Sequence, residues 1–499
     1  MKFKLLATTF AFALAMPAAA DVLVDNVEGI TFDEDGKIKR FNALVIDDDG
    51  KVAQILSSKD KKPQTDYREN GRGAVMIPGL IDAHAHVMGI GIGALTLDLS
   101  ETNSLEEALD KIRRFAAENE SRPWILGRGW NQEKWGLGRF PTAAELDSAV
   151  SDRPVYLQRV DGHAGWANSI AMQAAGITAE TKSPEGGRVE RMAGSQQPSG
   201  VFVDAAEELM TRAIPAPRPN ERDLAFAEAQ KVLNSYGITA VADMGTTIED
   251  WQVYRRAGDE GRLRLRISAW AEGTQQMELI AGARPTVWLY DQKLRLTGTY
   301  LPIDGAPESG RIWLSGAAQP PAGAGRFYDD SDLRNSMVRS AMDGFPVALG
   351  AHGDGAVEEA VAAIAELSQT YTGDNRWRIV GASGTPPVAV PAGLTVRFGG
   401  PGGTAGTAEA SFAPISGPAS YGEYIATSAL AARTLWPAKA GDMADFTGSL
   451  APGKQADFVL FEPDLRRADS FPAEVSETWI GGQPVWRSVK AQALLDAAR

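Results

Sequence analysis

Two histidines that lie close together in the sequence are the first candidates for chemistry. Residues 78–86 read Pro-Gly-Leu-Ile-Asp-Ala-His-Ala-His, so an apolar run ends in His84 and His86. Side chains at positions i and i+2 of a strand point to the same face, so both imidazoles can reach one metal ion. Because the motif is short, two pocket histidines that hold no metal are an equally good interpretation.

The chain contains only two further histidines among its four. His352 follows the apolar run 347–351, and the active sites of (β/α) barrels lie at the carboxyl ends of their strands. A structural histidine is the alternative for this position. His163 lies in the polar and aromatic segment 161–168, where a substrate contact and a hydrogen-bonded loop histidine are equally good interpretations.

Segment 124–140 is rich in tryptophan and arginine. Such a segment beside a pocket can bind a small organic or carboxylated substrate, and packing at a domain border is the alternative. We name four candidate substrate-binding residues from this segment and the next: Arg128, Trp130, Asp161 and His163.

Alternating apolar strands and amphipathic helices must position these residues. Helical spacing begins near Asn220 and again at Asp354, and apolar runs lie between the helices. This alternation predicts an α/β fold with a (β/α)₈ TIM-type barrel. Only residues 383–393, which include three prolines, separate the runs 377–382 and 394–398. That is short for a parallel crossover with a helix, so we expect an irregular barrel.

Both ends of the mature chain are rich in β-strand patterns instead. Asp35-Gly36 and Asp49-Gly50 are typical hairpin turns, and segment 450–486 alternates in a similar way. We therefore predict a small composite β-sandwich from residues 21–75 and 441–490, and a barrel domain over residues 76–440.

Composition excludes several classes of protein. The 499 residues include 50 Lys and Arg against 64 Asp and Glu, a net charge of −14, which argues against a nucleic-acid binder. With no cysteine, the chain has no disulfide, thiolate zinc site or cysteine nucleophile. A small-molecule substrate is the partner we expect, and the oligomeric state stays open.

Residues 1–20 have the pattern of a secretory signal peptide. Lys2 and Lys4 precede a short apolar run, and Ala18 to Ala20 offer a cleavage site. The run is too short to span a membrane, and no later segment qualifies. We expect cleavage after about Ala20, no membrane span in the mature chain, and a periplasmic or secreted location.

Several motifs together resemble the amidohydrolase superfamily, in particular the amidohydrolase-3 branch that includes N-substituted formamide deformylases. They are the histidine motif at 78–86, Gly-Arg-Gly-Trp-Asn-Gln-Glu-Lys-Trp at 127–135, Asp-Gly-His at 161–163 and Gly-Lys-Gln-Ala-Asp at 453–457. The resemblance covers nearly the whole mature chain. It implies a (β/α)₈ barrel beside a composite β-sandwich, and a metal-activated water that attacks a carbon–nitrogen bond.

The resemblance also implies a set of metal ligands, of which this chain keeps a part. His84 and His86 match the family's histidine pair, His352 matches the histidine after strand five, and His163 matches a histidine on the substrate side. Three positions depart and make the metal site degenerate: Tyr300 replaces a lysine, Gly381 replaces the strand-six histidine, and Gly-Gly-Pro at 399–401 replaces the motif with the general-base aspartate.

Two hypotheses follow. In the first, His84, His86 and His352 bind one divalent metal ion, with zinc as the first choice. Asp304, Glu308 or Asp354 then accepts a proton during hydrolysis of an amide-like bond. In the second, the protein is a catalytically inactive exported homologue that binds a small molecule or serves as a scaffold. Convergence of three imidazoles on one point would favour the first hypothesis.

Overall fold

The chain folds into two compact units. The computed structural model describes residues 22–33, 36–305, 312–315, 326–371, 377–381, 397–398, 429–462 and 474–496. Residues 1–80, 418–438 and 443–499 form one unit, which we call the terminal unit. Residues 81–417 and 439–442 form the other, which we call the barrel unit. The expected signal peptide, the candidate proton acceptor Glu308, the short connection 383–393 and the motif at 399–401 lie outside the described residues.

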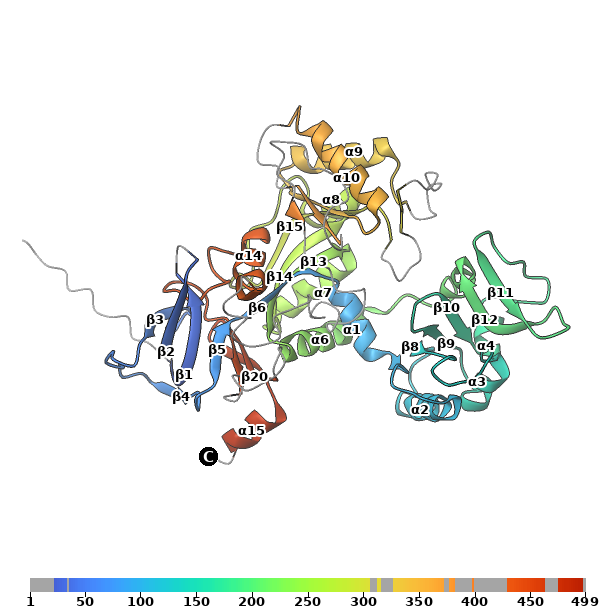
Figure 1. Cartoon of the computed structure of the whole chain (residues 1–499), viewed down its shortest axis with the longest axis horizontal. Helices are drawn as coiled ribbons and strands as arrows, with labels where there is room; N and C mark the ends of the chain where they lie inside the picture. Colours follow the sequence, from blue (N-terminus) through green and yellow to red (C-terminus); the bar gives the residue numbers. More distant parts are fainter. Residues whose placement is uncertain are drawn as a thin grey trace, which may run out of the picture. The chain divides into compact units, whose positions relative to one another are not determined.

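The terminal unit is built on one sheet that joins strands from both ends of the chain. Its order is β21-β20-β19-β5-β1-β2-β3, and β4 pairs with β1 (Figure 1). The central contact pairs β19 antiparallel with β5, so strands from the two ends join in one sheet, as expected. The sandwich packing stays a prediction. The strands are β1 (Val22–Phe32), β2 (Ile38–Ile46), β3 (Val52–Leu56), β4 (Tyr67–Asn70), β5 (Val75–Pro78), β19 (Phe458–Phe461), β20 (Val475–Ile480) and β21 (Gln483–Arg487).

The expected hairpin turn at Asp49-Gly50 is confirmed. It joins the antiparallel strands β2 and β3, and Gly50 has a φ of +74°, a conformation that suits glycine. Asp47 closes the turn by accepting the backbone N–H of Lys51 at 2.8 Å. Three short helices complete the described C-terminal part of the chain: α13 (Ala429–Arg433), α14 (Leu435–Ala440) and α15 (Val489–Asp496).

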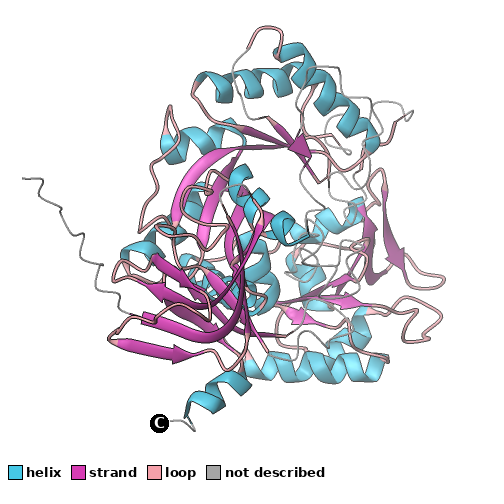
Figure 2. Ribbon diagram, turned by 60° about the vertical axis from the view of Figure 1, so that its left-hand side comes forward, coloured by secondary structure: helices cyan, strands magenta, loops and turns pink. Residues whose placement is uncertain are grey.

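The barrel unit contains a sheet in the order β18-β17-β16-β15-β14-β13-β6. Each neighbouring pair from β13 to β18 is parallel, and helices alternate with these strands (Figure 2). This arrangement agrees with a TIM-type barrel. Its strands are β6 (Leu80–Ala85), β13 (Ile238–Thr246), β14 (Arg266–Glu272), β15 (Leu294–Pro302), β16 (Val347–Gly350), β17 (Arg378–Val380) and β18 (Arg397–Phe398). Its helices are α1 (Val87–Leu95), α6 (Pro219–Ser235), α7 (Ile248–Asp259), α8 (Gly273–Ala281), α9 (Asp330–Met342) and α10 (Asp354–Leu367).

Two apolar layers hold the barrel together. The first is a buried cluster of one side chain or more from each of five neighbouring strands: Ala242, Met244, Trp270, Tyr300, Ala348 and Val380. The second joins β15 and β16 to the helices α9 and α10, whose apolar residues recur at helical spacing and are buried. The predicted helix from Asp354 is thereby confirmed, with the expected face inward.

A second sheet interrupts the barrel after α1, and sequence reasoning did not anticipate it as a separate layer. Its order is β11-β12-β10-β9-β8-β7. The strands are β7 (Leu97–Asp98), β8 (Ile125–Trp130), β9 (Val155–Arg159), β10 (Ala164–Ala167), β11 (Gly187–Arg191) and β12 (Pro198–Asp204). The helices are α2 (Leu105–Glu118), α3 (Ala143–Ala149), α4 (Ser169–Ala174), α5 (Glu208–Thr211) and the 3-10 turn η1 (Ala205–Glu207). We call this part the inserted sheet.

Two predicted elements have different bounds in the structure. The apolar run 74–81 is divided into β5 and β6 at Gly79, whose N–H donates to the carbonyl of Asp457 at 2.9 Å. The helix expected from Asn220 begins at Pro219, a residue whose missing N–H costs nothing in the first helical turn. The carboxylate of Glu221 caps this end by accepting the N–H of Arg218 at 2.7 Å.

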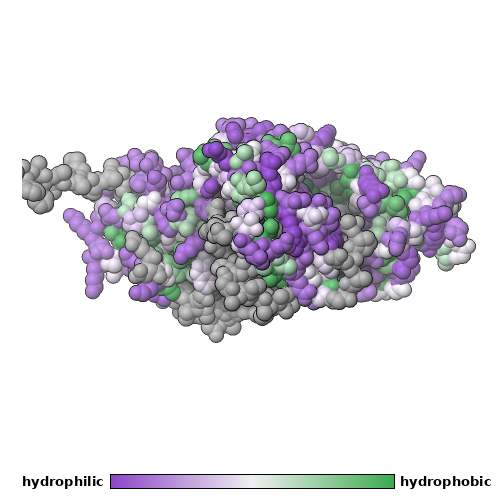
Figure 3. Space-filling model, turned by 90° about the horizontal axis from the view of Figure 1, so that it is seen from above, coloured by the Kyte–Doolittle hydropathy of each residue, from purple (hydrophilic) through white to green (hydrophobic). Residues whose placement is uncertain are grey.

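Among the described residues, no helix is long and apolar enough to cross a membrane. The face shown in Figure 3 is mainly hydrophilic, and its apolar spots are small and scattered.

Candidate functional site

His84 and His86 are brought together at the carboxyl end of β6. Their Nε2 atoms are 3.3 Å apart, and the rings meet edge to face at 74° with centroids 5.1 Å apart. Two nitrogen ligands about 2.0–2.1 Å from a tetrahedral metal ion are themselves separated by about 3.3 Å. The separation of the pair is that of two neighbouring ligands, and it is also that of a hydrogen bond between the two rings.

A backbone carbonyl on β13 orients the second of these rings. The Nδ1 of His86 lies 2.7 Å from the carbonyl oxygen of Met244. A carbonyl only accepts hydrogen bonds, so Nδ1 carries the hydrogen and Nε2 keeps a free lone pair. Metal-binding histidines usually have such a partner on their second nitrogen.

Asp243 fixes the same region from the neighbouring position on β13. Its carboxylate accepts hydrogen bonds from the N–H of Val87 at 2.8 Å, from Thr246 Oγ1 at 2.7 Å and from Tyr254 Oη at 2.9 Å. Burial raises its pKa to about 7, although these three hydrogen bonds oppose the shift. Because Val87 follows His86, β13 holds the histidine motif at two consecutive residues. Sequence reasoning missed Asp243, although a carboxylate at the end of an apolar strand was a usable signal.

Burial keeps both imidazoles neutral. It lowers the pKa of His84 well below its usual value, and the nearby charges of His86, His352 and Arg378 lower it further. Burial also lowers the pKa of His86, and the hydrogen bond to Met244 partly opposes this shift. The neutral ring is the form that binds metal ions.

Tyr300 fills the position that the family resemblance gives to a lysine. Its ring meets those of His84 and His86 edge to face, with centroids 5.9 and 6.3 Å away. Its hydroxyl lies against Gly350, where an added Cβ would approach to 2.4 Å. Burial raises the pKa of this phenol. We call the region at the carboxyl ends of the barrel strands the barrel mouth. The bulky neutral ring of Tyr300 thus occupies the side of the barrel mouth next to the histidine pair.

His352 follows the end of β16, and its predicted role as a metal ligand stays a prediction. Within the described part of the chain, no three His, Asp or Glu side chains form a group that could hold a metal ion. The three-histidine group stays a prediction, and Asp304 fixes the backbone around His352. Asp304 is buried and accepts the N–H of His352 at 2.8 Å, of Gly353 at 2.8 Å and of Trp313 at 3.0 Å.

These contacts also bear on the two predicted catalytic carboxylates. Asp304 is engaged by three backbone N–H groups, which fits a residue that positions the loop after β16. Asp354 lies in the first turn of α10, where Oδ1 accepts the N–H of Ser315 at 2.6 Å and of Gly355 at 2.9 Å. A role in proton transfer stays a prediction for both.

The chemistry of the donor set therefore fits a metal ion only in part. The histidine pair supplies two neutral nitrogen ligands at a suitable separation. His84 Nδ1 is buried with no hydrogen-bond partner, so the ring is not committed elsewhere. The pair supplies two of the three protein ligands that a catalytic zinc site usually has, with water as the fourth ligand. The degenerate metal site stays a prediction, which rests on Tyr300 and Gly381 at the positions that the family resemblance gives to a lysine and a histidine.

Trp130 is a core residue, which favours the packing alternative, and its substrate contact stays a prediction. It is fully buried, and its Nε1–H donates to the carbonyl of Leu157 at 2.8 Å. Its ring packs against Trp135, Phe140 and Trp166, with centroids 6.2–6.5 Å away.

His163 and Asp161 lie in the turn between β9 and β10 of the inserted sheet. Asp161 accepts the N–H of His163 at 3.1 Å and pairs with Arg159 at 2.6 Å. His163 Nδ1 lies 3.0 Å from Asp204 Oδ1, and both side chains are partly exposed. Arg128 lies half-buried on β8. Substrate binding by these residues stays a prediction.

The inserted sheet also contains a buried acid–phenol pair, formed by Tyr156 of β9 and Glu207 of η1, and no sequence signal pointed to it. Tyr156 Oη donates to Glu207 Oε2 at 2.9 Å. Burial raises the pKa of Glu207 to about 7, and nearby Asp204 and Asp161 add to the shift, whereas Tyr156 and His163 oppose it. Asp204 has a φ of +49°, which is strained for a residue other than glycine.

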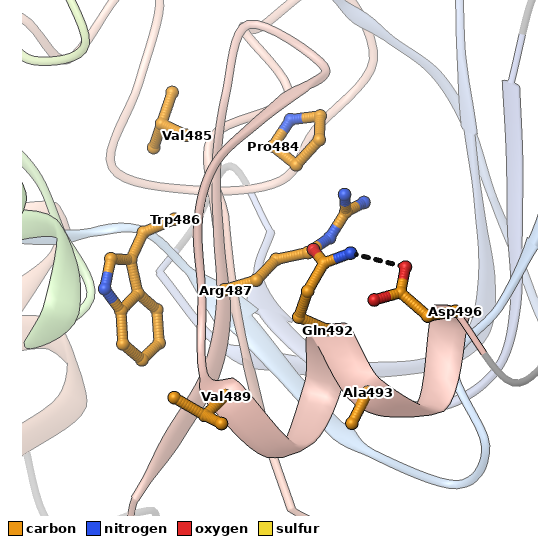
Figure 4. A pocket seen from close by; sticks show the side chains of 8 residues that line it. All are labelled: Pro484, Val485, Trp486, Arg487, Val489, Gln492, Ala493 and Asp496. Atoms are coloured by element: carbon orange, nitrogen blue, oxygen red, sulfur yellow. Dashed lines mark hydrogen bonds between the residues drawn. The ribbon is translucent and has the colours of Figure 1, made fainter.

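A groove of about 600 Å³ lies elsewhere, between β21 and α15 of the terminal unit (Figure 4). Its only charged lining residues are Arg487 and Asp496, and it contains no histidine. The groove therefore offers little of the chemistry found at the histidine pair.

Comparison with known sequences identifies one family. The model described as "Amidohydrolase family" matches residues 70–393 and 422–486. The chain is 30% identical over 411 residues to the protein LONG AFTER FAR-RED 3 of Arabidopsis thaliana, a match covering 78% of this chain and 68% of that protein. It is 29% identical over 349 residues to YtcJ of Bacillus subtilis, which is named as an amidohydrolase, covering 68% of this chain and 63% of YtcJ. It is 28% identical over 307 residues to the N-substituted formamide deformylase of Arthrobacter pascens, covering 57% of this chain and 55% of that enzyme.

Solved structures agree on the fold. An uncharacterized metal-dependent hydrolase from Pyrococcus horikoshii superimposes with a TM-score of 0.65 at 19% identity, over 91% of this chain and 99% of that one. A second, from Pyrococcus furiosus, has a TM-score of 0.63 at 20% identity, over 90% and 99% of the two chains.

Proposed function

The chain belongs to the amidohydrolase family, and from this premise we propose that it hydrolyses a carbon–nitrogen bond, other than a peptide bond, in a small molecule. Its similarity to an N-substituted formamide deformylase makes substituted formamides and related amides the first substrates to consider. We further propose that the protein works in the periplasm or outside the cell, on the basis of residues 1–20.

The geometry of the histidine pair is the observation that carries this proposal. Two neutral imidazoles with their Nε2 atoms 3.3 Å apart support a divalent metal ion, with zinc as the first choice. When bound, such an ion lowers the pKa of its water and polarises the substrate carbonyl.

The other residues of the barrel mouth orient the histidine pair and shield it from water. Met244 and Asp243 fix the ring of His86 and the turn after it, so its lone pair needs little reorganisation on binding. Tyr300 covers one side of the pair with an apolar ring. A water-poor surrounding strengthens the electrostatic interactions that stabilise a developing oxyanion.

Metal content and hydrolysis, measured together, test the proposal. The purified mature protein is analysed by elemental mass spectrometry next to a His84→Ala/His86→Ala variant. N-(4-nitrophenyl)formamide, N-alkyl formamides and simple amides serve as probes, with release of amine as the readout. We expect near-stoichiometric metal and turnover in the parent protein, and loss of both in the variant.

Two results would count against this function. Absence of metal after reconstitution removes the water-activation step. Retention of metal without turnover of any probe favours the inactive homologue that binds a small molecule or serves as a scaffold.

A further inference from the structure

Glu272 is the last residue of β14 and shares a face with the buried apolar layer of the barrel. Its Cα partner on the parallel strand β15 is Tyr300. Two residues earlier, Trp270 is opposite Gly298, where an added Cβ would come within 2.4 Å of the Trp270 ring. Trp270 and Tyr300 both belong to the apolar layer. Because side chains alternate along a strand, Glu272 lies on the same face as Trp270.

The ring of Tyr300 connects this position with the histidine pair. Its centroid lies 5.9 Å from that of His84 and 6.3 Å from that of His86. On β13, a Cβ added to Gly245 would lie 3.8 Å from Cδ1 of the same ring. Strand β14 lies between β13 and β15 in the sheet, so the ring crosses in front of its end. Neighbouring strands are about 4.8 Å apart, which places Glu272 beside the ring at the edge of the barrel mouth.

Tyr328 adds a second phenol to this edge. A Cβ added to Gly273, the residue after Glu272, would lie 3.4 Å from Oη of Tyr328. The ring packs, partly buried, against the apolar layer formed with α9 and α10. Burial is the main cause that raises the pKa of Tyr328 and of Tyr300, and the charge of Glu272 adds to both shifts. Two neutral phenols thus lie close to one carboxylate.

The carboxylate of Glu272 is not used to build the fold. Glu272 is the N-cap residue of α8, yet its side chain makes no capping hydrogen bond. Partial burial raises its pKa, and the negative charge of Asp250 raises it further. Asp250 itself is paired with Arg222 at 2.7 Å, whereas Glu272 has no such cation among the described residues. A carboxylate beside aromatic rings is a suitable partner for an organic cation.

We propose that Glu272 selects substrates whose nitrogen substituent carries a positive charge. This inference rests on the proposed hydrolysis and names the substrate class. A formamide has only hydrogen on its carbonyl carbon, so its nitrogen substituent is the part that extends from the histidine pair to the edge of the barrel mouth. Glu272 binds the charged group there, and the rings of Tyr300 and Tyr328 contact it. The net charge of −14 on the chain also attracts cations.

Two formamides of the same shape test this assignment. N-[2-(Trimethylammonio)ethyl]formamide is the cationic probe, and N-(3,3-dimethylbutyl)formamide is its neutral isostere. With release of formate as the readout, we expect kcat/KM of the parent protein to be about 10-fold higher for the cationic probe. In Glu272→Gln, the KM for the cationic probe should rise by about 10-fold at unchanged kcat, because a binding interaction outside the reacting bond is lost. The KM for the neutral probe should not change.

Two further variants separate the charge from general effects of substitution. Tyr328→Leu keeps the charge and removes one ring, so we expect the KM for the cationic probe to rise by about 3-fold. Glu358→Gln, at an exposed position of α10, is the matched control that removes a carboxylate elsewhere and should leave both KM values unchanged.

Equal kcat/KM for the two probes, or an unchanged KM for the cationic probe in Glu272→Gln, overturns this inference and leaves the proposed function intact. If neither probe is hydrolysed, isothermal titration calorimetry with the cationic probe decides. Weaker binding in Glu272→Gln than in the parent protein supports the cation site and counts against the hydrolysis alone. Equal binding by the two proteins, or no binding, overturns both.

Discussion

The two histidine-bearing regions of the barrel unit hold their imidazoles in opposite ways. At the barrel mouth, His84 is buried and His86 is half-buried, and the carbonyl of Met244 is the partner of the second ring. In the inserted sheet, His163 is 38% exposed and its ring nitrogen lies against the carboxylate of Asp204. A neutral partner in a dry surrounding preserves a lone pair for a metal ion. The solvent-exposed pair of His163 and Asp204 is suited instead to hydrogen bonding with a small molecule from solution.

The largest expected difference between the two regions is in metal affinity. We expect His84→Ala to weaken zinc binding by more than about 100-fold, because it removes one of two ligands. His163→Ala removes no ligand and should change the affinity by less than about 2-fold. Competition with a chromogenic chelator measures both. Equal effects of the two substitutions would show that the histidine pair binds metal no better than His163 does.

Asp243 should dominate the stability of the mouth. Asp243→Ala leaves the N–H of Val87 and the hydroxyls of Thr246 and Tyr254 without their buried acceptor. Each unsatisfied group costs about 1–3 kcal/mol, so we expect a loss of about 3–5 kcal/mol in the free energy of unfolding. Urea denaturation measures it, with Asp243→Asn as the matched variant that keeps the shape. A loss below about 1 kcal/mol would show that β13 does not fix the histidine motif.

Glu207 should make the inserted sheet sensitive to pH. Its pKa is about 7 in the fold against a usual value of 4.5, so the folded chain binds more protons between these values than the unfolded chain does. The free energy of unfolding therefore falls as the pH rises through this window. We expect Glu207→Gln to add about 1–3 kcal/mol of stability at pH of about 8 and little at pH of about 4.

Urea denaturation at the two pH values checks this, with exposed Glu185→Gln as the control. Equal effects of Glu207→Gln at both pH values would mean that Glu207 does not titrate in this window.

Substitution of Trp130 should give the smallest effect on stability. It also distinguishes a role in core packing from a role in substrate binding. Trp130→Phe loses a buried hydrogen bond to Leu157 and part of the aromatic cluster, so we expect a loss of about 1–2 kcal/mol in stability. The KM for the probes should not change. A raised KM at unchanged thermal stability would return this residue to the binding site.

The alternation of strands and helices could be predicted from the sequence because the patterns that indicate it are local. The stripe along α10 and the turn at Gly50 depend on residues only a few positions apart, and both are found as predicted. The histidine pair could be predicted for the same reason, because its two residues are only two positions apart. Its partners could not, since Met244 and Asp243 lie more than 150 residues away in the chain.

The surroundings of two other predicted site residues also depend on distant contacts. Trp130 was placed beside substrate from the composition of its segment, but strands β9 and β10 bring Leu157 and Trp166 over it. His352 has the expected place at the end of β16, yet its backbone is fixed by Asp304, 48 residues earlier. Side-chain direction at a strand end depends on such neighbours, which spacing alone does not reveal.

The sheet of the terminal unit has a consequence for the order of folding. Strand β5 finds its antiparallel partner β19 only after nearly the whole intervening chain, and the N–H of Leu450 bonds to Thr31 across 419 residues. Closing so long a loop is slow, and contacts of this separation delay folding. Until β19 arrives, one edge of β5 is a bare template for pairing with another chain. A chain shortened before residue 458 should keep that edge permanently and aggregate through it.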